Sequence, residues 1–377
     1  MNAGLGLYIH WPYCARVCPY CDFNVYRQRG RDTAPLLQAI ADDLRAHAAL
    51  MGRRRLDTIF FGGGTPSLLA PQVVAALIET AAHCFTLAPD AEISLEANPE
   101  DRAQFAALIA AGINRLSIGA QALDDAALRA LGRNHDAAGA IAAIEAAART
   151  GARVSADFIY ARGGQDVASW REELARIVRL PVEHLSLYEL TVAEGTAFAR
   201  AAARGRLAAP DDALAADFYL ATQGMCEAAG FPAYEVSNHA RRTEAQARHN
   251  LIYWRCGEWL GLGPGAHGRI VRDGVRVATK AFDAVDAYAA AVAAQGTGWE
   301  SETPVTAEAE AEEAVIMGLR VVEGFDRAAV ERARAAPLNE SLLADLAREG
   351  LLVQRGGRVA LTARGRLLAD RIAQMLA

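Results

Sequence analysis

Hydrophobic residues alternate along the chain between short runs and longer stretches with helical spacing. Six short apolar runs, each followed by turn residues, predict buried strands at 5–10, 57–61, 92–96, 115–118, 154–160 and 184–188. Between these runs, apolar residues recur every three or four positions and predict amphipathic helices at 34–50, 71–84, 102–111, 137–150 and 168–178. Strand and helix therefore alternate about six times along the first part of the chain.

This alternation predicts an α/β fold. Parallel strands joined through helices need right-handed crossovers, and six such units curl into an incomplete (β/α)6 barrel. The catalytic face of a barrel of this kind lies at the C-terminal ends of its strands. We therefore expect the functional residues at the strand ends.

Beyond about Thr303 the pattern changes to short helices at 308–320, 326–333 and 338–349, followed by strands at 351–354 and 359–362. A Gly356-Gly357 turn separates the two strands, and the whole predicts a small winged-helix-like α+β domain. The expected organisation is a barrel over 1–240, a connecting segment over 241–302 and a C-terminal domain over 303–377.

Composition narrows the class of protein. The 377 residues are 52% hydrophobic, which is enough for one large and one smaller domain. The net charge of −6 argues against a nucleic-acid partner, and acids interspersed with the C-terminal arginines predict a solvated face there. The sequence has neither an apolar run of membrane-spanning length nor a signal-peptide pattern at its start. We expect a cytoplasmic protein with at most peripheral membrane contact.

Cys14, Cys18 and Cys21 form a C-x3-C-x2-C run just after the first predicted strand. Three thiolates on one loop can hold three irons of a 4Fe-4S cluster and leave the fourth iron open to another ligand. Zinc sites usually take four ligands in two pairs, and a redox dithiol needs only one pair. Core packing or disulfides remain the alternative, although three cysteines cannot pair evenly.

Polar residues follow successive predicted strands. The run Gly62-Gly63-Gly64-Thr65-Pro66 follows the second strand, where a bare backbone can approach a ligand, although a simple turn explains it equally well. The other polar strand-end positions are Glu96, Asn98, Gly119, Gln121, Arg133 and Asp157. Singly, each is more often a solvated residue, but together they form a ring suited to one ligand with hydroxyl, amine and carboxylate groups. A second glycine-rich segment, 261–268, is expected to approach either a ligand or its own barrel.

These motifs resemble those of radical S-adenosylmethionine (SAM) proteins of the oxygen-independent coproporphyrinogen oxidase family, and within it those of the HemW haem chaperones. The likeness covers nearly the whole chain. Besides the cysteine run and the glycine loop, it includes Leu131-Gly-Arg133, Tyr234-Glu-Val-Ser-Asn238 and His249-Asn-Leu-Ile-Tyr253-Trp254.

The resemblance implies that Cys14, Cys18 and Cys21 ligate a 4Fe-4S cluster, whose open iron takes the amino and carboxylate groups of SAM. The residues that it implies around SAM are Tyr8, Tyr20, Gly63, Gly64, Thr65, Glu96, Gln121, Arg133 and Asp157. It also implies haem as a ligand, with His249 as the leading iron ligand and His267 and Cys256 as alternatives. A purely structural role for His249 stays equally open.

Two departures separate the chain from the oxidases that it resembles. Those enzymes carry a further cysteine where this chain has Phe23, and a longer N-terminal arm where only seven residues precede Tyr8. Both departures favour a chaperone that passes haem to apo-haemoproteins such as cytochromes, without coproporphyrinogen III oxidase activity. The alternative is a radical SAM oxidase acting on coproporphyrinogen III or another reduced substrate. Whether SAM is consumed is open, and the resemblance suggests both monomeric and homodimeric forms.

Overall fold

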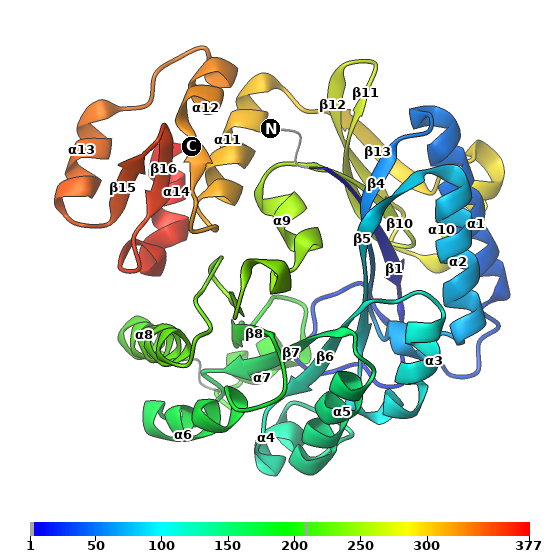
Figure 1. The fold of residues 1–377 in the computed structure, drawn as a ribbon, viewed down its shortest axis with the longest axis horizontal. Helices are drawn as coiled ribbons and strands as arrows, with labels where there is room; N and C mark the ends of the chain where they lie inside the picture. The colour runs from blue at the N-terminus through cyan, green and yellow to red at the C-terminus, as the bar shows by residue number, and fades with distance from the viewer. Residues whose placement is uncertain (1–3, 208–209) are drawn as a thin grey trace.

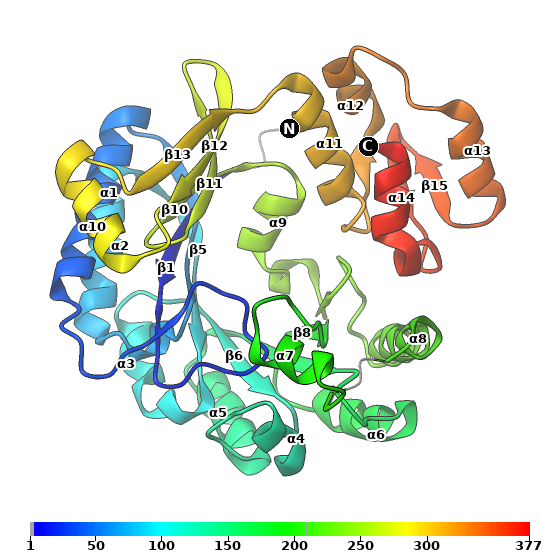
Figure 2. The same cartoon turned by 180° about the vertical axis from the view of Figure 1, so that it is seen from behind.

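A curved sheet with helices around its outer side forms the larger part of the protein, and a small domain packs beside it (Figures 1 and 2). The computed structural model describes residues 4–207 and 210–377. The large sheet has 11 strands in the order β13-β12-β11-β10-β1-β4-β5-β6-β7-β8-β9.

The six predicted strands form the adjacent, parallel centre of this sheet, which confirms the predicted fold class. They are β1 (Leu5–Trp11), β4 (Arg55–Gly63), β5 (Thr86–Ala97), β6 (Arg115–Gln121), β7 (Arg153–Tyr160) and β8 (His184–Glu189). The predicted helices are α1 (Ala34–Met51), α2 (Pro71–Cys84), α3 (Phe105–Ala110), α5 (Ala137–Arg149) and α6 (Val167–Ile177). The third helix is shorter than predicted because a 3-10 turn, η2 (Pro99–Gln104), precedes it.

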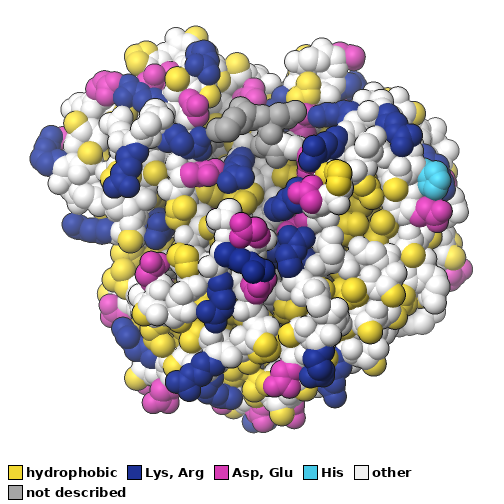
Figure 3. All heavy atoms as spheres, in the orientation of Figure 1, with side chains coloured by type: hydrophobic (Ala, Val, Ile, Leu, Met, Phe, Trp, Pro, Cys, Tyr) yellow, Lys and Arg dark blue, Asp and Glu magenta, His cyan; other side chains and the backbone are white. Residues whose placement is uncertain are grey.

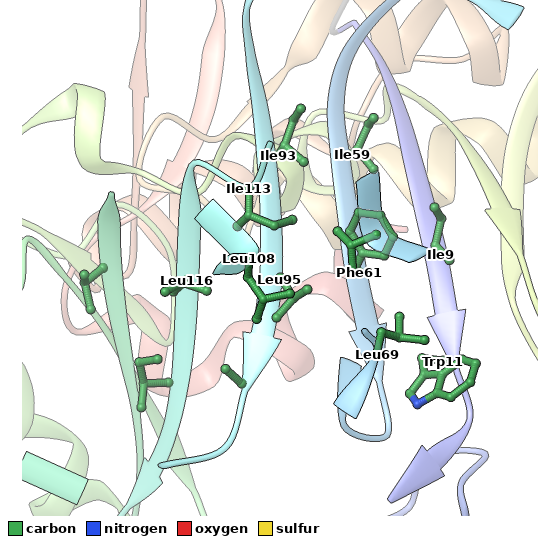
Figure 4. Packing of buried hydrophobic residues seen from close by; sticks show 14 of the residues in the cluster. Ile9, Trp11, Ile59, Phe61, Leu69, Ile93, Leu95, Leu108, Ile113 and Leu116 are labelled. Carbon is green, nitrogen blue, oxygen red and sulfur yellow. The ribbon is translucent and has the colours of Figure 1, made fainter. Parts of the chain in front are cut away.

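Alternation along each strand determines which side chains face the site. On the outer face, apolar side chains such as Ile9, Phe61, Leu95 and Leu116 are buried in one core with the surrounding helices (Figure 4). The intervening positions point to the inner face and carry polar groups. Thus each strand contributes packing on one side and polar groups on the other.

The segment 241–302 adds four strands to the sheet. After α9 (Arg248–Trp254), β10 (Glu258–Leu262) pairs in parallel with β1, and β11 (His267–Arg272), β12 (Val275–Ala281) and β13 (Trp299–Pro304) follow antiparallel. Helix α10 (Val285–Gln295) lies beside α1. We call β10 to β13 with their connecting loops the sheet extension. At the opposite end, β9 (Asn238–Ala240) pairs antiparallel with β8.

Seven further elements among the described residues complete the barrel half. They are β2 (Tyr13–Cys14), β3 (Tyr26–Arg27), η1 (Pro66–Leu68), α4 (Asp125–Ala130), α7 (Ala197–Ala203), α8 (Asp212–Ala228) and η3 (Thr243–Ala245). Strands β2 and β3 pair with each other on either side of the cysteine loop.

The C-terminal domain has its own three-stranded sheet and its own core. Its elements are α11 (Ala307–Gly318), β14 (Phe325–Asp326), α12 (Arg327–Arg334), α13 (Glu340–Arg348), β15 (Leu352–Arg355), β16 (Arg358–Leu361), η4 (Gly365–Leu368) and α14 (Ala369–Leu376). The predicted helices and strands are all present, and β14 and α14 are additional. Val315, Leu343 and Val359 are fully buried in this separate core.

Basic and acidic side chains are interspersed on the face seen in Figure 3, including over the C-terminal domain. None of the helices within residues 4–207 and 210–377 is both long and apolar enough to cross a bilayer.

Candidate functional site

The cysteine loop and the C-terminal ends of the parallel strands line one cavity of about 410 Å³. Thirteen of the residues proposed from the sequence line it: Cys14, Cys18, Tyr20, Cys21, Gly63, Gly64, Thr65, Glu96, Asn98, Gly119, Gln121, Arg133 and Asp157. They come from the cysteine loop and from the ends of β4 to β7 and their following loops. The structure therefore brings together groups that lie up to 143 residues apart in the sequence, from Cys14 to Asp157.

The three thiols share the cavity but differ in surroundings. Burial raises the pKa of Cys14 to about 11, although a hydrogen bond with Thr65 opposes this shift. Cys18 Sγ accepts a hydrogen bond from Arg133 Nη1 at 3.4 Å. Among the described residues, no three potential ligands converge to hold a single metal ion. In a cluster each thiolate binds a different iron, so three sulfurs facing one cavity fit such a group.

The glycine loop brings the end of β4 against the chain on either side of Pro12. Gly63 has φ +106°, and a Cβ there would lie 2.5 Å from the His10 ring. A Cβ on Gly64 would lie 2.6 Å from the Tyr13 carbonyl oxygen. Both glycines are therefore required by the protein's own packing, and both also expose backbone to the cavity.

Two acidic side chains face the cavity from β5 and β7. Burial and the nearby Asp157 carboxylate raise the pKa of Glu96 to about 8, while the hydrogen bond from the Gly63 amide to Glu96 Oε2 (3.0 Å) opposes the shift. Burial raises the pKa of Asp157 to about 6, against hydrogen bonds from Ser186 and Ser117. Ser117 Oγ donates to Asp157 Oδ2 at 2.9 Å.

Arg133 connects the cysteine loop with the ends of β5 and β6. Its Nη2 donates to Asn98 Oδ1 and to the Gly119 carbonyl oxygen (3.2 Å). Its buried Nε has no hydrogen-bond partner among the described residues. An unpaired guanidinium N–H in a polar cavity suits a ligand carboxylate, so the donor set fits the amino-acid end of SAM.

Tyr8 lies outside the cavity lining. Its hydroxyl is 2.9 Å from His10 Nδ1, and burial raises the pKa of the phenol well above its ordinary value. This side chain contacts the residues that support the site rather than the cavity itself.

His249 is 1% exposed and lies on α9, away from the cavity. Its Nδ1 is 2.7 Å from Thr58 Oγ1, and its Nε2 is 2.6 Å from the Tyr253 hydroxyl. Burial lowers the pKa of the imidazole to about 3. Both ring nitrogens are paired, so iron could reach one only if a hydrogen bond broke and the site opened.

The two alternative haem ligands have different surroundings. His267 begins β11 and is exposed, with no hydrogen-bond partner for its ring among residues 4–207 and 210–377. Cys256 is half-buried after α9, and burial raises the pKa of its thiol to about 11.

Several cavity residues were not among the predicted site residues. They are Arg16, Phe23, Val25, Ser117, Ile159, Tyr188, Glu189, Leu190, Thr191 and Ala193, besides Asp22 and Ala97. Tyr188 and Glu189 end β8, the sixth strand, and the rule that function lies at strand ends could have found them.

Comparisons with known proteins agree with this geometry. The family model "Radical SAM superfamily" matches residues 8–177, and "HemN C-terminal domain" matches residues 305–368. A relative from Mycobacterium tuberculosis, "Heme chaperone HemW", is 40% identical over 98% of this chain and 94% of its own length. The chain belongs to the HemW family of radical SAM proteins. Membership of this superfamily implies a 4Fe-4S cluster and SAM.

Other relatives also cover most of the chain. "Heme chaperone HemW" of Bacillus subtilis is 32% identical over 97% of both chains. The Bos taurus protein "Radical S-adenosyl methionine domain-containing protein 1, mitochondrial" is 42% identical over 85% of this chain and 74% of its own length. The solved coproporphyrinogen III oxidase HemN from Escherichia coli has a TM-score of 0.82 at 23% identity, over 99% of this chain and 89% of its own, which shows a shared fold.

Proposed function

We propose that the protein is a haem chaperone that holds a 4Fe-4S cluster and SAM in this cavity and delivers haem to apo-haemoproteins such as respiratory cytochromes, working in the cytoplasm. The observation that supports this most strongly is a single cavity with three thiols and a ring of polar strand-end groups. It occurs in a chain 40% identical, over nearly its full length, to a relative named as a heme chaperone.

In this proposal each side of the cavity has its own task. Cys14, Cys18 and Cys21 hold the cluster, and Arg133 pairs with the carboxylate of SAM. Glu96 and Asp157 accept hydrogen bonds from ribose hydroxyls or the amine, and the chain excludes water from the site. A bound cluster would supply one electron to the sulfonium of SAM.

The choice of haem ligand depends on which histidine has a ring nitrogen free to bind iron. Iron needs an imidazole with a free lone pair, and both nitrogens of His249 are paired inside the fold. His267 is exposed, and its pKa is lowered by partial burial and by the neighbouring Lys280 and Arg269 cations, which favours the neutral ring that binds iron. We propose His267 as the ligand in this conformation, with His249 available only after α9 moves.

Phe23 supports the chaperone over the oxidase. It is 60% exposed and lines the cavity beside the cysteine loop, where it offers apolar surface but no proton donor or ligand. Val25 and Leu190 line the same cavity, so apolar contacts are available to a porphyrin edge. The polar groups proposed to bind SAM are all present, and radical chemistry needs them. The second candidate function is therefore a radical SAM oxidase of coproporphyrinogen III or another reduced substrate.

One anaerobic experiment separates the two candidates. The reconstituted, reduced protein is given SAM with either haem or coproporphyrinogen III, and haem absorbance, 5′-deoxyadenosine and porphyrin products are followed together. The chaperone proposal expects stoichiometric haem binding without porphyrin product. Turnover to a decarboxylated porphyrinogen with matching 5′-deoxyadenosine would establish the oxidase instead.

The ligand assignment is tested on the same preparation. His267→Ala is expected to lose the haem spectrum, whereas His249→Phe, which fills the buried site, is expected to retain it. The reverse result would assign iron to His249 and require an opening of α9.

A further inference from the structure

Asn24, three residues after Cys21, joins three separate parts of the chain. Its side-chain NH₂ group donates to the carbonyl oxygens of Pro264 (3.0 Å) and Asp283 (2.8 Å). The backbone carbonyl oxygen of Asn24 accepts a hydrogen bond from His10 Nε2 at 2.9 Å. Pro264 follows β10 and Asp283 follows β12, so the end of the cysteine loop is bonded both to β1 and to the sheet extension.

His10 transmits this connection into the barrel. Its side chain is 5% exposed, and burial lowers its pKa, so the ring is neutral near pH 7. Because Nε2 donates to the Asn24 carbonyl oxygen, Nδ1 carries no proton and accepts from the Tyr8 hydroxyl (2.9 Å). Tyr8, His10 and Asn24 therefore form one hydrogen-bonded chain from the barrel interior to the loop.

Glycines in the 261–268 segment allow this close contact. Gly265 has φ +77°, and a Cβ there would lie 2.6 Å from Asn24 Nδ2. Gly263 has φ +97°, and a Cβ there would lie 2.3 Å from the His10 carbonyl oxygen. The sequence predicted that this segment lies close either to a ligand or to its own barrel, and these glycines lie against the barrel. The Tyr26 hydroxyl adds a further bond to the Asp283 carbonyl oxygen (3.0 Å).

We propose that Asn24 is a positioning residue that fixes the cysteine loop against the sheet extension. The inference rests on the proposed cluster site. The extension contributes no residue to the cavity lining, yet through Asn24 it would control how firmly the three thiols are held. A primary amide is needed here because it can donate to two carbonyls at once, whereas the isosteric carboxylate of aspartate can donate to neither.

The first test uses the apoprotein and needs no cluster. Asn24→Asp and Asn24→Ala are compared with wild type and with Arg27→Ala, an exposed side chain of β3 that makes no hydrogen bond among the described residues. Thiol reactivity toward a chromogenic disulfide is followed, and mass spectrometry locates the modified cysteines. Loss of both hydrogen bonds predicts roughly 30-fold faster reaction of Cys14, Cys18 and Cys21, which corresponds to about 2 kcal/mol.

The pattern of reactivity distinguishes positioning from general stability. The proposal expects Cys84, Cys226 and Cys256 to react as in wild type, and Arg27→Ala to match wild type at all six thiols. Uniform acceleration of all six thiols would overturn the positioning role in favour of a merely structural one. Unchanged reactivity of the loop thiols in both Asn24 variants would also overturn it.

The second test measures iron loss from the reconstituted protein to a ferrous chelator. Asn24→Asp is expected to lose iron about 30-fold faster than wild type, by the same hydrogen-bond estimate. Tyr8→Phe, which keeps the ring but removes the hydroxyl, is expected to show a smaller increase. Equal rates in all proteins would contradict the inference. Failure of wild type itself to take up iron would count against the proposed cluster site, while the thiol mapping would still decide the role of Asn24.

Discussion

At the residue scale, Glu96 gives the apoprotein a characteristic pH dependence. Burial raises its pKa from 4.5 to about 8, so the folded chain binds more protons than the unfolded chain between these values. The free energy of unfolding therefore falls as the pH rises from about 4.5 to 8. We predict that Glu96→Gln, which carries no charge, is more stable than wild type at pH 8 by up to about 4 kcal/mol, since one unit of pKa shift corresponds to about 1.4 kcal/mol.

Urea unfolding of the two apoproteins at pH 5 and pH 8 measures this difference. At pH 5 the variant and wild type should be close, because Glu96 is then protonated in the folded protein. Asp157→Asn is the matched control: because the pKa of Asp157 is about 6, its gain over wild type develops below about pH 6.5 and then stays constant up to pH 8. An identical pH profile for wild type and Glu96→Gln would show that the carboxyl is ionised in the fold.

Arg133 is expected to determine SAM affinity. Hydrogen bonds to charged groups contribute about 1.5–3 kcal/mol, so Arg133→Ala should weaken SAM binding by roughly 10- to 100-fold. Arg133→Lys keeps a cation near Cys18 but loses the planar guanidinium that also reaches Asn98. Its SAM affinity should therefore lie between those of wild type and Arg133→Ala. Equilibrium dialysis of SAM on reconstituted protein tests this, and wild-type affinity in Arg133→Ala would contradict the assignment.

At the element scale, the turn after β4 depends on glycine for packing as well as for conformation. Gly63→Ala combines a positive φ with a Cβ 2.5 Å from the His10 ring, and should destabilise the fold by roughly 3–5 kcal/mol. Gly164 also has a positive φ, +79°, but has open space around it, so Gly164→Ala should cost only about 1–2 kcal/mol. Thermal unfolding of both variants measures the difference, and equal losses would show that the contact with His10 is relaxed.

Some strands of the large sheet could be predicted from the sequence, and others could not. The six central strands carry continuous apolar runs buried on one face, and a local pattern is enough to predict them. The sheet extension was not predicted because β10 and β11 contain Gly261 and Gly268, and β11 and β12 carry Arg269, Arg276 and Lys280. Pairing with β1 and with each other stabilises these strands, and that pairing is not visible in a local window.

The site shows the same limit. Cysteine spacing and strand-end positions predicted twelve residues of the cavity lining, because those signals are local, and the family resemblance added Tyr20. Tyr8 and His249 could not be placed in this way. One of the two partners of His249 is Thr58, 191 residues earlier, and that contact exists only in the folded barrel.

At the scale of the whole molecule, two ion pairs join the C-terminal domain to the rest of the chain, beside a backbone bridge between Glu235 and Val321 and a small apolar cluster around Val321. Arg255 pairs with Glu323 (2.8 Å), and Arg269 of β11 pairs with Glu313 of α11 (2.8 Å). Such partly exposed pairs contribute about 0.5 kcal/mol each. We predict that Glu313→Ala/Glu323→Ala increases proteolysis in the 304–306 linker several-fold while the unfolding temperature changes little.

The control for this prediction is Arg348→Ala, which removes a pair with Asp345 inside the C-terminal domain. It should leave cleavage of the linker unchanged. If the double variant is cleaved no faster than wild type, apolar packing rather than charge holds the two parts together.

The central claim is that Cys14, Cys18 and Cys21 hold a cluster whose open iron binds SAM. The most direct measurement is the electron paramagnetic resonance spectrum of the reconstituted, reduced protein with and without SAM, for wild type and Cys18→Ala. The account predicts one reduced cluster per chain in wild type, with a signal that changes when SAM is added, and loss of that signal in Cys18→Ala. A wild-type spectrum unchanged by SAM, or a normal cluster in Cys18→Ala, would contradict it.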